Sequence, residues 1–130
     1  MLRKFAEGSG QSAGEFYKPK EVSVLMAKIL DPEEGESVYD PCCGSGGLLI
    51  KCYIKEKYQD KPDAKPLHFY GQEINHTTYA IVKMNAFLHD MENTEIALGE
   101  SMRNPVFKEK DGSLKKFDII TANPMWETCQ

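Results

Sequence analysis

Apolar residues recur along the chain with two periods, and this pattern predicts the secondary structure. Short runs rich in β-branched and aromatic residues predict four strands, over 37–40, 67–73, 94–98 and 117–122. Longer segments whose apolar residues lie three or four positions apart predict helices over 18–30, 46–58 and 74–90. In the first helix the pattern defines one apolar face, formed by Val22, Leu25, Met26, Ile29 and Leu30.

The connections between the predicted strands are too long for hairpins. Strands that alternate with helices in this way predict an α/β fold with a doubly wound, mostly parallel sheet. Ligands bind to such sheets beyond the carboxyl ends of the strands. The residues best suited to bind a ligand or catalyse a reaction all end or follow predicted strands: Asp40, Glu73, Glu100 and the sequence "NPMW" at 123–126.

Length and composition fit one domain, since the chain has 130 residues of which 41% are hydrophobic. We expect a flexible lead-in over residues 1–13 and a folded part over 14–130. No apolar run approaches the roughly 20 residues of a membrane span, and the polar start is unlike a signal peptide. We therefore expect a cytoplasmic protein. The four cysteines suggest neither a disulfide framework nor a metal site, because no CxxC pair is present.

The formal net charge of −4 bears on possible partners. A protein that binds nucleic acid by itself usually carries a basic stripe, whereas the lysine clusters at 108–110 and 115–116 are small. If this protein acts on DNA, most of the affinity for the phosphate backbone must come from elsewhere.

The segment "DPCCGSGG" at 40–47 predicts a ligand-binding loop between a strand and a helix. Its glycines let the backbone approach a ligand closely. A nucleoside triphosphate would need a Lys-Ser/Thr pair after the glycines, which is absent. A dinucleotide would bring its diphosphate close to the Asp40 carboxylate, whereas S-adenosylmethionine brings a sulfonium and an ammonium. The alternative is a glycine-rich turn in which Asp40 caps a helix.

Two further acids follow strands. Glu73 could accept hydrogen bonds from both ribose hydroxyls, as acids at this position do in other nucleotide folds; otherwise it is a solvated acid at a strand end. Glu100 could reach an adenine amine, which is the weaker of the two inferences because surface acids are common.

The sequence "NPMW" could hold a conjugated amine such as that of adenine. The side-chain carbonyl of Asn123 and the backbone carbonyl of Pro124 could accept the two amine hydrogens, which frees the nitrogen lone pair to attack a methyl sulfonium. Such catalysis works by positioning the reacting groups and by electrostatic stabilisation of the transition state. Trp126 could stack on the base, which is worth roughly 1–3 kcal/mol. The alternative is a turn with Trp126 as a core residue.

Together these motifs resemble the modification subunit of type I restriction–modification systems, a family of DNA adenine methyltransferases. "GEFYKPKEV" at 14–22 is similar to the family's "GEFYTPREV", and "DPCCGSGGLL" and "GQEIN" are similar to its cofactor motifs. "ANPMW" stands where the family has Asn-Pro-Pro-aromatic. The resemblance implies a Rossmann-like, S-adenosylmethionine-dependent methyltransferase fold that methylates the adenine amine in DNA.

The resemblance also implies residue roles. Asn123, Pro124 and Trp126 would be catalytic and hold the flipped adenine. The cofactor would be bound by Phe16, Tyr17, Lys18, Asp40, Pro41, Gly44, Ser45, Gly46, Glu73, Glu100 and Asn123. Two residues depart from the family pattern: Lys18 replaces a common Thr, and Met125 replaces the second Pro. No metal is implied.

The family has a helical domain before this region and further strands after it, so we expect the chain to be the cofactor-binding part of a truncated catalytic domain, inactive alone. The implied partners are DNA and the specificity and restriction subunits of a type I complex. Two alternatives remain open: a methyltransferase that acts on protein glutamine or RNA, and a non-catalytic module that binds cofactor or a partner. An NAD-dependent dehydrogenase is disfavoured by Asp40 and by the Asn-Pro-Met-Trp turn.

Overall fold

The computed structural model describes residues 20–57 and 61–124, which form a single parallel sheet with helices against it. The elements, in chain order, are α2 Lys20–Leu30, β1 Ser37–Asp40, α3 Gly47–Lys57, β2 His68–Glu73, α4 His76–Leu88, β3 Thr94–Leu98 and β4 Ile119–Ile120. Each matches an element predicted from the sequence. The last strand is shorter than the predicted 117–122, because only Val38 and Tyr39 of β1 pair with it. No helix in the described part of the chain is both long and apolar enough to cross a membrane.

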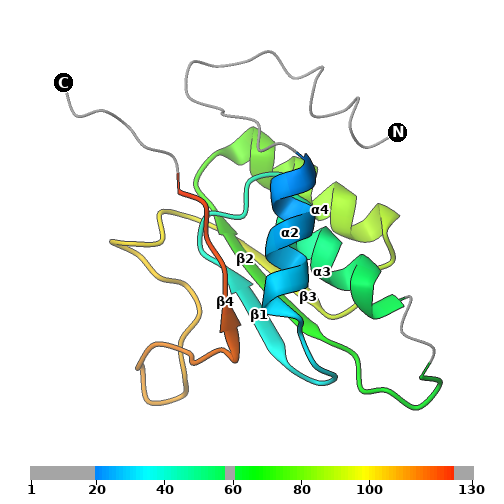
Figure 1. The fold of residues 1–130 in the computed structure, drawn as a ribbon. Helices are drawn as coiled ribbons and strands as arrows, with labels where there is room; N and C mark the ends of the chain where they lie inside the picture. Colours follow the sequence, from blue (N-terminus) through cyan, green and yellow to red (C-terminus); the bar gives the residue numbers. More distant parts are fainter. Residues whose placement is uncertain (1–19, 58–60, 125–130) are drawn as a thin grey trace.

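The sheet has the strand order β3-β2-β1-β4, and every neighbouring pair is parallel. All carboxyl ends therefore lie at one edge, as the sequence predicted. The three described helices lie together on one face of the sheet (Figure 1). The residues of β1 and β2 that point to this face, among them Val38 and Phe69, join the buried core with Leu49 and Cys52 of α3 and Val82 of α4.

The helix α2 packs through a face that overlaps only partly with the apolar one defined by the sequence, since Leu30 packs against the core. Ser23 and Ala27 are its buried residues, one turn apart, whereas Leu25 and Ile29 are 57% and 72% exposed. Small side chains let two helices approach closely, so the helix is turned to bring Ser23 and Ala27 inward. The apolar stripe that includes Leu25 and Ile29 is left largely facing solvent.

The opposite face of the sheet is covered by the segment between β3 and β4 (Figure 1). Because side chains alternate along a strand, Tyr39 and Tyr70 point away from the helices, and both meet Phe107 and Phe117 of this segment. The Tyr39 and Phe117 rings are stacked with centroids 4.5 Å apart, and the Tyr70 and Phe107 rings meet edge-on at 5.2 Å. These contacts hold the long segment against the sheet on its way to β4.

Candidate functional site

The predicted site residues follow the carboxyl ends of adjacent strands. Asp40 ends β1 and Glu73 ends β2, while Glu100 and Asn123 follow β3 and β4. The strand order places these residues along the edge in the spatial order Glu100, Glu73, Asp40 and Asn123. The topology therefore brings together four residues that lie up to 83 positions apart in the chain.

The glycine-rich loop between β1 and α3 is fixed by hydrogen bonds to its backbone. The Cys43 N–H donates to the carbonyl of Gln72 at 3.1 Å, and the Gly46 N–H donates to the carbonyl of Cys43 at 2.9 Å. The Gly44 N–H donates to the Glu73 carboxylate at 2.9 Å. The Ser45 carbonyl accepts from the side-chain amide of Asn85 at 2.9 Å. The loop conformation is thus set by β2 and α4 as well as by its own glycines.

This loop has one packed side and one open side. A Cβ atom built on Gly46 would lie 2.7 Å from Val82 Cγ2 of α4, whereas a Cβ on Gly44 or Gly47 would meet no atom within 4 Å. Gly44 and Gly46 also have φ angles of +54° and +83°, in the region that favours glycine. Gly46 therefore serves packing against α4, and the backbone around Gly44 and Gly47 is accessible to a ligand.

Glu73 connects the loop to the start of α4. One carboxylate oxygen accepts from the Gly44 N–H at 2.9 Å, and the other accepts from the Asn75 N–H at 3.0 Å. Asn75 in turn caps α4, since its side chain accepts from the Thr78 N–H at 3.0 Å. A carboxylate oxygen has two lone pairs, so each Glu73 oxygen keeps the capacity for one further donor such as a hydroxyl.

Asp40 lies beneath the loop and is only 1% exposed. Its carboxylate accepts from the Cys42 N–H at 3.0 Å, which forms the turn out of β1. This carboxylate contributes to the raised pKa of two nearby thiols. Burial and then Asp40 raise the pKa of Cys52 to about 11. Burial, Asp40 and Glu73 raise the pKa of Cys43 as well. Both thiols are therefore neutral near pH 7. The carboxylates of Asp40 and Glu73 lie next to the loop, where they would favour a cationic group.

Glu100 bonds to its own loop. Its carboxylate accepts from the N–H groups of Met102 and Arg103 at 2.8 and 2.7 Å, and these bonds lower the pKa of Glu100. The loop is anchored to the sheet by Gln72, which is 0% exposed. The Gln72 side chain donates to the carbonyl of Asn104 at 2.9 Å and accepts from the Val106 N–H at 3.2 Å.

The structure describes only some of the remaining predicted residues. Pro41 is joined to the β3 side of the site, because its carbonyl accepts from the Ser101 hydroxyl. Asn123 and Pro124 follow β4 and are both exposed. Four predicted residues lie outside the described residues: Phe16, Tyr17, Lys18 and Trp126. Sequence reasoning missed the buried anchors Gln72 and Asn85, although an amide one helical turn after Val82, on the buried side of α4, is a readable signal.

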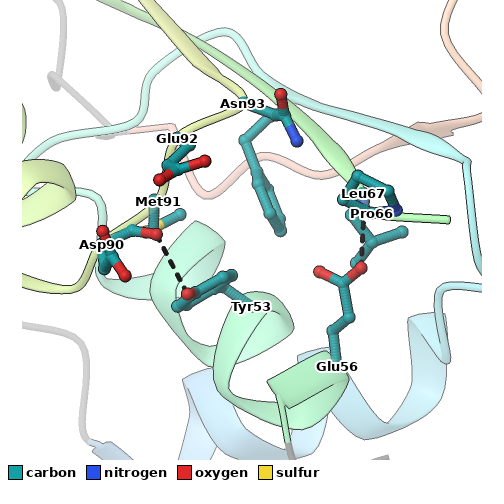
Figure 2. Close-up of a pocket in the computed structure, with 9 residues that line it drawn as sticks. Tyr53, Glu56, Pro66, Leu67, Asp90, Met91, Glu92 and Asn93 are labelled. Carbon is teal, nitrogen blue, oxygen red and sulfur yellow. Dashed lines mark hydrogen bonds between the residues drawn. The ribbon is translucent and has the colours of Figure 1, made fainter. Parts of the chain in front are cut away.

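A separate hollow of about 280 Å³ lies at the amino ends of β2 and β3, far from these residues. Figure 2 shows its lining, in which Tyr53 of α3 faces the loop before β3. The Tyr53 hydroxyl donates to the carbonyl of Asp90 at 3.0 Å. This hollow and the predicted site are at opposite edges of the sheet.

Comparison with known proteins supports the sequence resemblance. Residues 1–129 match the family described as N-6 DNA Methylase. The chain belongs to this N-6 DNA methylase family. It is 31% identical, over 95% of its length, to the methylase subunit of the type I restriction enzyme MpnII of Mycoplasma pneumoniae. It is 38% identical, over 87% of its length, to that of MjaVII of Methanocaldococcus jannaschii. The chain spans 24% and 18% of these two relatives.

Crystal structures agree with the family assignment. A type I modification subunit from Vibrio vulnificus matches with a TM-score of 0.72 and 33% identity, over 95% of this chain and 26% of that one. A type I methyltransferase subunit from Streptococcus thermophilus matches with a TM-score of 0.70 and 30% identity, over 89% of this chain and 24% of that one. The predicted Rossmann-like methyltransferase fold is confirmed. The family description favours DNA over the alternatives of RNA and protein glutamine.

The residues of this N-6 DNA methylase chain fit S-adenosylmethionine, the cofactor expected from the sequence and used by the fold family. Gly44 and Gly47 leave an open cradle, Glu73 retains acceptor capacity at a strand end, and Asp40 gives the loop a negative field. A diphosphate at the loop would be repelled by the Asp40 carboxylate.

The two sides of the glycine loop predict opposite effects of alanine. Gly46→Ala is expected to destabilise the fold by about 2 kcal/mol or more, because it combines a clash with Val82 and a positive φ. Gly47→Ala is expected to leave stability unchanged or raise it by up to about 1 kcal/mol, because the site is open and alanine favours the helix. Urea unfolding of both variants measures this. Equal losses would contradict the assignment of packed and open sides.

Proposed function

We propose that this chain is the cofactor-binding part of an enzyme that methylates the exocyclic amine of adenine in DNA, the methylase subunit of a type I restriction–modification system. The proposal extends to the whole enzyme, of which the chain represents about a quarter by comparison with its relatives. The residue roles given below belong to the same proposal.

The order of side chains along the sheet edge is the observation that carries the proposal. Glu100, Glu73, Asp40 and Asn123 follow one another in the strand order β3-β2-β1-β4. A ligand made of adenine, ribose and a cationic sulfonium, followed by a methyl acceptor, needs partners in that same order. We assign Glu100 to the adenine amine, Glu73 to the ribose hydroxyls and the loop above Asp40 to the cationic end.

The loop and its acids would do most of the cofactor binding. Gly44 and Gly47 would form the open side of the cradle, within the loop that also contains Pro41, Ser45 and the packed Gly46. Glu73 would offer one free lone pair on each oxygen to the two ribose hydroxyls. Phe16, Tyr17 and Lys18 would complete this site from the preceding segment. When bound, the cofactor supplies a methyl group activated by positive charge on sulfur.

Asn123 and Pro124 would hold the substrate amine. The Asn123 side-chain oxygen and the Pro124 carbonyl accept its two hydrogens, which draws the nitrogen lone pair out of the ring and directs it for attack. Trp126 stacks on the base that has left the duplex, and offsets part of the few kcal/mol that base flipping costs. Methyl transfer would leave one excess proton on the amine nitrogen, and this proton would pass to solvent, so no side chain with a tuned pKa is needed.

The net charge of −4 supports the proposal that other subunits provide most of the contacts with DNA. Few phosphate contacts and little counterion release are available to such a chain. We assign DNA recognition to a specificity subunit and cleavage to a restriction subunit of the same complex. An enzyme that modifies chromosomal DNA in a bacterium or archaeon works in the cytoplasm, and the proposal includes that location.

Cofactor choice can be tested on the 130-residue chain itself. Calorimetric titration is expected to give tighter binding of S-adenosylmethionine and S-adenosylhomocysteine than of NAD, because Asp40, next to the glycine loop, repels a diphosphate. Glu73→Gln is expected to weaken the first two by about tenfold, since glutamine has one acceptor oxygen where Glu73 has two. Glu95→Gln, an exposed change in β3, is the matched control. Tighter binding of NAD would contradict the proposal.

The role of Asn123 requires a complete methylase that contains this segment. Asn123→Ala is expected to lower kcat by about 10²–10³-fold, as for loss of one transition-state hydrogen-bond partner, with cofactor affinity within about twofold of wild type. The measurement is methyl transfer to unmethylated duplex DNA, with exposed Asn93→Ala as the control. Unchanged turnover in Asn123→Ala would show that the Asn-Pro turn is structural.

A further inference from the structure

Asn85 is a buried polar side chain inside a helix, which needs a physical reason. It is 7% exposed and lies in the last turn of α4, one turn after the buried Val82. Asparagine is a weaker helix former than leucine, and burying its amide costs free energy unless the amide is hydrogen-bonded. Among the described residues, the Asn85 side-chain amide donates one long-range hydrogen bond, to the Ser45 carbonyl 40 positions earlier at 2.9 Å.

The bond from Asn85 fixes the peptide unit between Ser45 and Gly46 from one end. The Gly46 N–H, at the other end of the same planar unit, donates to the Cys43 carbonyl at 2.9 Å. With both ends bonded, this peptide cannot rotate without breaking a hydrogen bond. Val82 packs against Gly46 so closely that no side chain would fit there, which restricts this part of the loop further. Two residues of one α4 face therefore shape the packed side of the loop.

We propose that Asn85 is a positioning residue for the cofactor: without touching it, Asn85 holds the glycine loop in its binding conformation. This inference rests on the proposed function of the loop. If Asn85 only filled space, an apolar side chain of similar size would serve the helix and the core better. The amide instead gives directional control of the Ser45–Gly46 peptide, whose other side is the open cradle at Gly44 and Gly47.

The test uses Asn85→Leu, which keeps the number and branching of the side-chain heavy atoms and removes the donor, in the 130-residue chain. The control is Tyr53→Phe, which removes a hydrogen bond of the same kind at the opposite edge of the sheet: Tyr53 to the Asp90 carbonyl at 3.0 Å (Figure 2). Calorimetry with S-adenosylhomocysteine gives the affinity, and urea unfolding gives the folded fraction. Amide proton exchange at Gly44, Ser45, Gly46 and Gly47 reports the loop directly.

We expect Asn85→Leu to bind S-adenosylhomocysteine about tenfold more weakly than wild type, the effect of one hydrogen bond, while it remains folded. Its loop amides are expected to exchange faster than those of wild type. Tyr53→Phe is expected to stay within about twofold in affinity. Wild-type affinity in folded Asn85→Leu would overturn the inference and leave the proposed function intact. Failure of the wild-type chain to bind the nucleoside would instead overturn the proposed function, and the inference with it.

A measurement on the wild-type chain covers the case in which Asn85→Leu does not fold. The side-chain amide protons of Asn85 can be followed by NMR during titration with S-adenosylhomocysteine. If Asn85 holds the loop, these protons exchange slowly and become more protected when the loop is occupied. Asn85 protons that exchange freely and do not respond, while the Gly44 and Gly46 amides shift, would overturn the inference.

Discussion

The site depends on how the chain leaves β1 and turns into α3 while keeping its buried backbone polar groups bonded. Glycines make the turn sterically possible, but they also make it flexible, so the conformation has to be imposed from outside the loop. Gln72 and Glu73 at the end of β2 bond the first half, and Asn85 of α4 bonds the second. The cradle is thus a product of three elements that meet at one edge of the sheet.

The same edge explains how residues far apart in the chain come to lie at one candidate site. Parallel pairing places the carboxyl ends of β3, β2, β1 and β4 side by side, and a polar residue follows each of them. Glu73 has both a structural and a proposed binding role, since it accepts from Gly44 and Asn75. Asp40 is fully buried, and its proposed effect on a ligand is exerted through its charge and through the turn that it forms with Cys42.

Much of this architecture could be predicted from local sequence patterns. Period-two and helical spacing predicted the four strands and three helices of the described residues, and the acids at strand ends pointed to the edge where the candidate site lies. Periodicity could not predict which face of α2 is covered, because that face is chosen by the small residues Ser23 and Ala27 and not by the apolar stripe. Nor could it predict the anchors Gln72 and Asn85, since their bonds join residues 32 to 40 positions apart.

The most direct test of the account is the direction in which a nucleoside cofactor lies along the sheet edge. Intermolecular NOEs between S-adenosylhomocysteine and the isotope-labelled chain measure this. The account predicts that the adenine protons lie near the turn after β3 at Gly99 and Glu100, the ribose protons near Glu73 and Ile74, and the homocysteine end near Gly44. Adenine protons next to Ala122 and Asn123, at the β4 side, would contradict it.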